Sequence, residues 1–205
     1  MPPTGDTMFA LAEVGGLEHP PESIPSHLQL GAVDVNLLQN TVEMTLDAEQ
    51  SDQQVIVTVT LENTGAGHHV PTDFPGRHMI LVVRAMDQTG QTLELVHGPT
   101  VPEWGGPQAG LPGQAFAKIL RDVVTGERPV VSYWKQTQIV SDNRIAALES
   151  DISNYTFALP ASADGEVQIA AVLTFRRVFY SVSELRGWDM PDITMEEAVL
   201  QMPIN

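Results

Sequence analysis

The chain has 205 residues, of which 42% are hydrophobic and 18% are charged, so it can bury a sizeable core and is unlike a disordered protein. Ten Lys and Arg face 26 Asp and Glu, and this net charge of −16 argues against nucleic acid or an anionic membrane surface as a partner. The sequence has no cysteine, which excludes disulfides, thiolate metal sites, thiol nucleophiles and covalent attachment of haem to this chain.

The first 32 residues are rich in proline and glycine, and we expect them to form an extended arm or linker with one helical turn near residues 8–14. Their start shows no signal-peptide pattern and is interpreted either as an engineered start or as a cut from a longer chain. Two histidines of the arm, His19 and His27, are candidates for contact with a neighbouring module, and the simpler interpretation is that both are solvated. No apolar run approaches ~20 residues, so no membrane span is predicted.

From about Val33 the pattern becomes that of strands. β-branched and apolar residues alternate with polar ones over 55–61, which indicates a strand with one buried face. Over 79–85 both alternating sets are apolar, so both faces are expected to be covered. A turn at 87–90 and a return strand over 92–96 then predict a hairpin. The Gly/Pro-rich stretch 98–114 is a long loop of the kind that is usually functional or interfacial.

Further strands are expected over 116–120, 137–140, 155–159 and 167–175. Residues 194–201 form either a short helix capped by Thr194 or a terminal strand. Seven or more short strands without long helical periodicity predict an all-β protein, an antiparallel β-sandwich of immunoglobulin-like or jelly-roll-like type. We assign it to residues 33–205, after the 1–32 arm.

The most distinctive stretch joins two of these strands and reads ENTGAGHHVPTDFPGR over residues 62–77. Its histidines His68 and His69, with His78 beyond them, are candidates for binding a haem iron or another metal that the sequence leaves unknown. Adjacent residues of an extended chain point to opposite sides, so His68 and His69 are poorly placed to share one ion. The alternative is that His68 holds the loop backbone.

Other polar and rigid residues of this region are interpreted as structural. Pro71, Arg77, Asp142 and Arg144 are expected to lock loops, the arginines by pairing with carboxylates or carbonyls. Trp104, in the Gly/Pro loop, is the best candidate for an interface anchor. Trp134 is expected in the core. No catalytic residue is predicted, because none of the common catalytic motifs occurs.

The segment Asn63–Thr72, followed by Arg77, resembles the Asn-x-x-x-Gly-His-x-x-Pro-Thr-Gly…Arg signature of a β-rich domain at the C-terminal side of multihaem c-type cytochromes. The resemblance runs from about residue 50 to the end. Its later landmarks are 110–113 with 116–118, Trp134, 141–145, 155–157, 171–176 and 191–196. The chain departs from the family in having Asp73 in place of a glycine, in Ala146-Ala147 where a proline often precedes the glutamate, and in having no Cys-x-x-Cys-His.

The resemblance implies a non-enzymatic accessory module, periplasmic or extracellular, whose partner is a multihaem c-type cytochrome or another electron-transfer subunit. It implies no covalently bound cofactor in this chain and an axial contact to a partner's haem, for which His68 is the first candidate. Two alternatives stay open. One is a periplasmic metal-binding protein that uses histidine, and the other is a purely structural sandwich subunit of an extracellular assembly.

Overall fold

The computed structural model describes residues 3–26, 31–72, 74–161 and 165–204, and the chain divides into two compact units, 1–33 and 34–205. The first unit contains three short 3-10 turns, η1 (Ala12–Val14), η2 (Pro21–Ser23) and η3 (Gly31–Val33). An isolated antiparallel bridge joins Pro3 to Pro25. The turn expected near residues 8–14 is thus present as η1.

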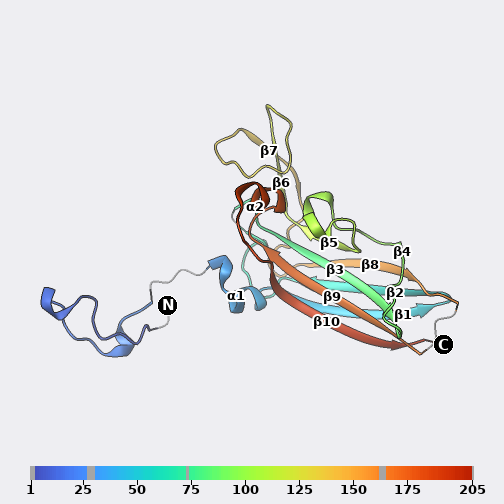
Figure 1. Ribbon diagram of the computed structural model, residues 1–205, viewed down its shortest axis with the longest axis horizontal. Helices are drawn as coiled ribbons and strands as arrows, with labels where there is room; N and C mark the ends of the chain where they lie inside the picture. Colours follow the sequence, from blue (N-terminus) through green and yellow to red (C-terminus); the bar gives the residue numbers. More distant parts are fainter. Residues whose placement is uncertain (1–2, 27–30, 73, 162–164, 205) are drawn as a thin grey trace. The chain divides into compact units, whose positions relative to one another are not determined.

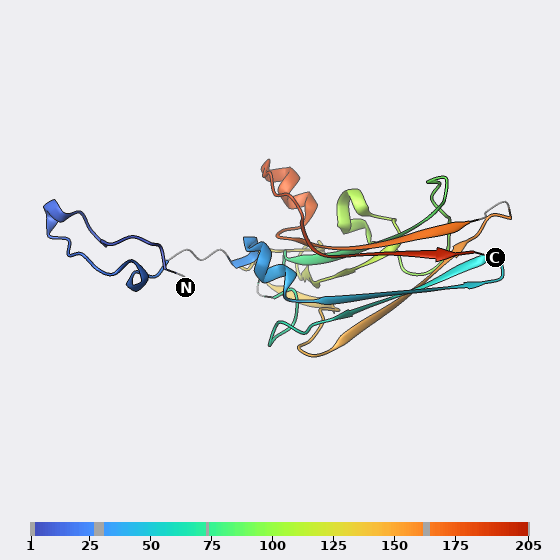
Figure 2. The same cartoon turned by 90° about the horizontal axis from the view of Figure 1, so that it is seen from below.

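The second unit is built on two four-stranded antiparallel sheets (Figures 1 and 2). One sheet has the order β1 (Glu43–Ser51), β2 (Gln54–Glu62), β8 (Ser150–Ala158), β4 (Leu95–His97). The other has the order β10 (Ile193–Pro203), β9 (Glu166–Arg176), β3 (His78–Asp87), β5 (Gly113–Phe116). A separate pair, β6 (Lys118–Asp122) and β7 (Thr137–Asp142), forms a two-stranded hairpin at one end. The predicted all-β sandwich is confirmed.

The core between the two sheets follows from the alternation in the sequence. Along β2, Val55, Val57, Val59 and Leu61 are buried while the residues between them are less so, as the period of two requires. The strand β9 repeats this pattern from Val167 to Phe175. Each fully buried Val or Leu contributes about 1.5–3 kcal/mol relative to an exposed one, so these faces hold the sheets together.

The opposite face of β3 is also covered, as its sequence predicts. Ile80 and Val82 pack with Val101 and Ala115, and Trp104 and Leu111 lie against this cluster. The cover comes from the 98–114 segment, which contains the 3-10 helix η4 (Glu103–Gln108), and from the helix α2 (Tyr180–Arg186) beside it. Figure 2 shows η4 and α2 together on the outer side of the β10–β9–β3–β5 sheet. The long loop is therefore a packed layer.

Three local expectations are resolved. The predicted hairpin over 79–96 is wrong beyond its turn: Leu93 still bonds to Ala85, but β4 then crosses to pair with β8 in the other sheet. Residues 194–201 form the edge strand β10, the second of the two alternatives. Trp134 is 71% exposed, which contradicts its expected place in the core, because it lies in the connection between β6 and β7.

A short helix, α1 (Val35–Gln39), precedes β1, where the sequence indicates the start of the strand region. The side chain of Asp34 caps it by accepting a hydrogen bond from the backbone N–H of Leu37. In the described part of the chain, every helix is too short or too polar to cross a membrane.

Candidate functional site

The crossover between β2 and β3 is held by one buried amide side chain. Asn63 is fully buried, and its Nδ2 donates to the carbonyl oxygens of His68 (2.8 Å) and Ile145 (3.2 Å). Its Oδ1 accepts from the backbone N–H of Ala66 at 3.1 Å. The side chain of Asn63 thereby closes the turn on itself and ties it to the segment after β7, where Val70 and Ile145 form an antiparallel bridge.

The glycines of this crossover differ in what they allow. Gly65 lies against the backbone of Asn40, where a Cβ atom would collide with the Asn40 carbonyl group. Gly67 has open space around it. The close approach at Gly65 accounts for one glycine of the motif, whereas Gly67 is free of such a contact.

Both histidines of the crossover are exposed, and they differ in their surroundings. The Nδ1 of His68 lies 3.1 Å from the carbonyl oxygen of His69, a contact that requires the proton on Nδ1 and leaves the lone pair on Nε2. The charge of His69 helps to lower the pKa of Asp142, so these two side chains are electrostatic neighbours. The structure therefore brings the His68–His69 turn beside the end of β7.

The residues interpreted as loop locks make the following contacts. Arg144 donates to both carboxylate oxygens of Asp142 at 2.7 Å, and this hydrogen bonding is the largest cause of the lowered pKa of Asp142. Arg77 donates to the carbonyl oxygen of Thr72 at 3.4 Å, across the crossover. Pro71 is buried and follows a cis peptide bond.

His78 occupies a different environment from the other two histidines. It is fully buried, its ring stacks on Phe179 (centroids 4.9 Å apart, 14° between planes), and Trp104 meets it edge-on at 5.4 Å. Its Nδ1 donates to the carbonyl oxygen of Gly76 at 2.9 Å, while Nε2 is buried without a hydrogen-bond partner. Burial is the main cause that lowers the pKa of His78 to about 4, so the ring is neutral near pH 7.

A buried arginine stands directly across from His78 in the β3–β9 pairing. Arg176 donates to both carboxylate oxygens of Asp192 at 2.7 Å and to the carbonyl oxygen of Gly105 at 2.8 Å. It also reaches Oε1 of Gln108 at 3.2 Å. One guanidinium thus fastens η4 and the entry to β10 onto the end of β9.

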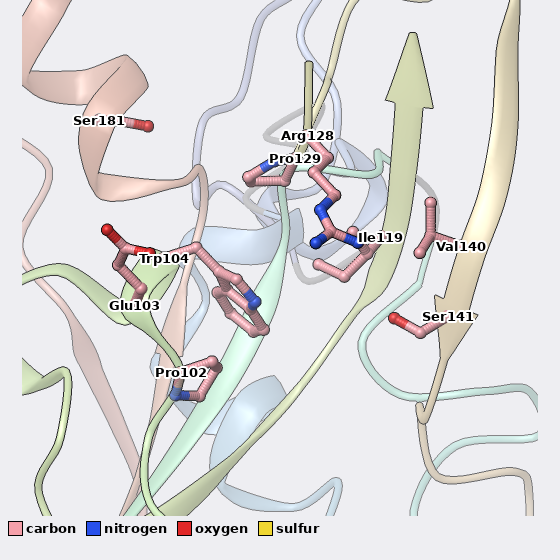
Figure 3. Close-up of a pocket in the computed structure, with 9 residues that line it drawn as sticks. All are labelled: Pro102, Glu103, Trp104, Ile119, Arg128, Pro129, Val140, Ser141 and Ser181. Atoms are coloured by element: carbon pink, nitrogen blue, oxygen red, sulfur yellow. The ribbon is translucent and has the colours of Figure 1, made fainter. Parts of the chain in front are cut away.

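A cleft of about 610 Å³ opens beside this aromatic cluster, between η4, α2 and the β6–β7 hairpin (Figure 3). Its apolar walls come from Trp104, Ile119, Val140 and two prolines. Its polar lining consists of Glu103, Arg128, Ser141 and Ser181. Trp104, the predicted interface anchor, is therefore a wall of a cleft, and its ring is fixed from behind by His78 and Phe179 at 5.4 Å each.

The other two predicted residues, His19 and His27, belong to the N-terminal arm. His19 lies in the first unit, where its ring meets Phe9 edge-on at 5.2 Å. His27 falls outside the described residues. The described side chains include no group of three or more His, Asp or Glu that is placed to hold a metal ion.

Four residues that shape the site have roles that the sequence analysis does not predict. Asn63 was part of the quoted motif, and its burial directly after an apolar strand is the signal that points to a structural amide. Arg176 likewise ends a long apolar strand, and a charge there requires a buried partner. Phe179 and Arg128 carried no sequence signal, because their roles depend on how the η4, α2 and β6–β7 segments fold together.

Comparison with known proteins shows a likeness of fold. No family model and no curated protein matches the chain. A penta-haem cytochrome c552 from Thermochromatium tepidum has a similar structure, with a TM-score of 0.64 and 19% identity, over 92% of this chain and 44% of the cytochrome. This chain therefore spans less than half of that protein, and the likeness shows a shared fold. A PapD-like domain of human CEP192 aligns with a TM-score of 0.28 and 9% identity, over 87% of this chain and 93% of that domain, too low a score to indicate a common fold.

Because Asn63 holds the crossover, we expect that replacing one atom of its side chain strongly lowers the stability of the fold. In Asn63→Asp, a carboxylate oxygen replaces the Nδ2 donor and faces two carbonyl oxygens in a buried place, so we expect a loss of at least about 2 kcal/mol in the free energy of unfolding. Asn154→Asp is the matched control, because the exposed Asn154 only accepts from Thr58 Oγ1 and a carboxylate accepts equally well. Urea unfolding measures both, and equal midpoints would show that the Asn63 amide does not hold the crossover.

His78 predicts a pH-dependent stability. The folded pKa lies below the unfolded value of 6.5, so the unfolded chain binds the proton first as the pH falls. The contribution of neutral His78 is therefore fully present above pH 6.5 and is lost between 6.5 and about 4, at up to about 1.4 kcal/mol per pH unit.

Urea unfolding at several pH values between 7.5 and 4 tests this. The stacked variant His78→Phe should have a shallower decline than the wild type, whereas the exposed control His97→Phe should keep the wild-type slope. If the free energy of unfolding falls equally with pH in the wild type and in both variants, protonation of His78 is not coupled to unfolding.

Proposed function

We propose that this chain is a haem-free, non-catalytic module of a multihaem cytochrome assembly, exported to the periplasm or the cell exterior, that packs against haem groups carried by a partner or by an upstream region. The observation that carries the proposal is the fold shared with part of a penta-haem cytochrome over 92% of this chain. The cytochrome signature that the crossover resembles supports it independently of the fold. Since this chain has no cysteine, a covalently attached haem must belong to another polypeptide or to another part of the protein.

The crossover supports a specific role for His68 within this proposal. Other residues of the motif have structural roles. The side chain of Asn63 donates to two carbonyl groups, and Gly65 packs against Asn40. Val70 forms a bridge to Ile145. The imidazole of His68 is left exposed. Histidines that ligate metals usually donate their second ring N–H to a carbonyl or carboxylate, which fixes the tautomer. The contact of His68 Nδ1 with the carbonyl of His69 matches that arrangement and would leave Nε2 as the ligand atom.

His78 has no comparable access. Both ring nitrogens are enclosed by the aromatic cluster and the Gly76 backbone, so a metal bound there would have to displace Phe179 or Trp104. Within the proposal, His78 is a packing residue and His68 the axial ligand. His69, which is exposed and lies next to Asp142, is the neighbouring residue that makes a suitable control.

Isolation of the tagged chain from its native host tests the proposal. We expect it to co-purify with a polypeptide that carries covalently bound haem, identified by its c-type absorption bands and by mass spectrometry. In His68→Ala, one haem of the complex should change from low-spin to high-spin, as recorded by electron paramagnetic resonance, whereas His69→Ala should leave the spectrum unchanged.

The outcomes separate the two parts of the proposal. Assemblies of the chain without any haem protein would overturn the cytochrome function and favour a structural subunit. If a haem complex forms and its spectrum is the same in His68→Ala, the proposed cytochrome function stands, but His68 is not an axial ligand.

A further inference from the structure

The cleft beside Trp104 contains a cation that the fold does not use. Arg128 lines the cleft, and no hydrogen bond or ion pair holds its guanidinium among the residues that the structure describes. Figure 3 shows the guanidinium beside Ile119, within the space bounded by Trp104 and Val140. Glu103, the acidic residue of the lining, lies across the cleft with its carboxylate directed away from Arg128.

Most other charges of the hairpin are paired, which sets Arg128 apart. Lys135 binds Asp122 at 3.0 Å and Glu127 at 3.4 Å, and Arg144 binds Asp142 at 2.7 Å. Arg121 donates to the side chain of Gln138 at 2.8 Å. The acidic partners that the hairpin offers are therefore committed elsewhere, and an incoming anion meets a free guanidinium.

The charge along the chain favours an anion at this place. Residues 1–76 contain no Lys or Arg, whereas residues 118–144 contain five of the ten. The same segment has three acidic residues, so the hairpin is locally cationic in a protein whose net charge is −16. An anionic ligand is repelled by most of the surface and is attracted to the hairpin.

The apolar walls define the rest of the ligand. Trp104 presents an indole that His78 and Phe179 hold in place, so little side-chain entropy is lost when a flat ring packs against it. Ile119 and Val140 line the same space, and about 610 Å³ lies within the range of small-molecule and cofactor sites. A flat apolar body with a carboxylate at its edge satisfies both the walls and Arg128.

We propose that this cleft binds the carboxylate-bearing edge of a flat apolar ligand and that, in the assembly proposed above, the ligand is the propionate edge of a partner's haem. Arg128 pairs with the propionate through parallel N–H···O bonds, and Trp104 packs against the ring edge. The inference rests on the proposed function for the identity of the ligand, whereas the cleft itself does not depend on the partner.

The first experiment uses the isolated chain and metal-free mesoporphyrin IX as the probe, at a concentration where it is monomeric, and its binding is followed by fluorescence anisotropy. We expect saturable binding that Arg128→Gln weakens about tenfold or more, because a charge-assisted hydrogen bond is lost. Val140→Glu, at an exposed wall position, should weaken it through repulsion of the carboxylates. Arg84→Gln is the matched control and should bind like the wild type, because Arg84 lines a separate pocket on the outer sheet face.

Circular dichroism of each variant establishes that it is folded before its affinity is compared. Equal affinities of the wild type and of Arg128→Gln, or no saturable binding by the wild type, would overturn the cleft as a carboxylate site.

The second experiment asks whether the ligand is the partner's haem. Mesoporphyrin IX should compete with the haem-bearing partner for the chain, and Arg128→Gln should weaken the complex by a similar factor. Probe binding without competition would overturn the assignment to a partner's haem and point to a free carboxylate ligand. If no haem protein co-purifies but the probe binds and Arg128→Gln weakens it, the proposed function fails while the cleft stands.

Discussion

The buried guanidinium of Arg176 is the constraint on which the η4 layer of the sandwich and the cleft beside it depend. A cation that is only 6% exposed must have its donors occupied, since an unpaired buried charge costs several kcal/mol. Its partners come from two segments: Asp192 before β10, and Gly105 and Gln108 in η4. Satisfying Arg176 therefore folds the 98–114 segment down onto the sheet and brings Trp104 over β3.

The same arginine affects the chemistry of its neighbour. His78 faces Arg176 across the β3–β9 pair, and the positive charge adds to burial in lowering the pKa of His78. A neutral imidazole stacks on Phe179 without a second buried cation to compensate. The aromatic cluster, the wall of the cleft and the loop layer are thus linked through one ion pair, and the β6–β7 hairpin supplies the other wall.

Sequence periodicity predicts the parts of this fold that depend on local burial. The strands around Val55–Leu61 and Val167–Phe175 are found where alternation places them, and the doubly apolar β3 is covered on both faces. The failures come from choices between distant partners. The chain after Leu93 leaves β3 for β8, and nothing in residues 92–97 distinguishes one strand edge from another.

The residues of the site also divide into those with a local sequence signal and those whose role depends on distant segments. The sequence identifies the crossover and Trp104, because glycine, proline and tryptophan in a long loop are local signals. It cannot identify Arg128 or Phe179, whose importance arises only when β6, β7 and α2 converge. The helix α2 lacks a side-chain N-cap, and its clearest sequence signal is Gly187, which ends it in the left-handed conformation.

The net charge alone gives an incomplete picture of how such a module meets a partner. A charge of −16 leads to the expectation that an acidic surface steers a cationic protein, and Glu43, Asp47 and Glu49 along the edge strand β1 fit that role. Salt at physiological strength screens exposed charges beyond about 8 Å, so the charges adjacent to a contact dominate its short-range energetics. At the cleft the adjacent charge is Arg128 on a locally cationic hairpin. In the proposed assembly, the long-range approach and the final contact would therefore involve opposite charges of the same molecule, and the contact at Arg128 would be the step that selects a carboxylate.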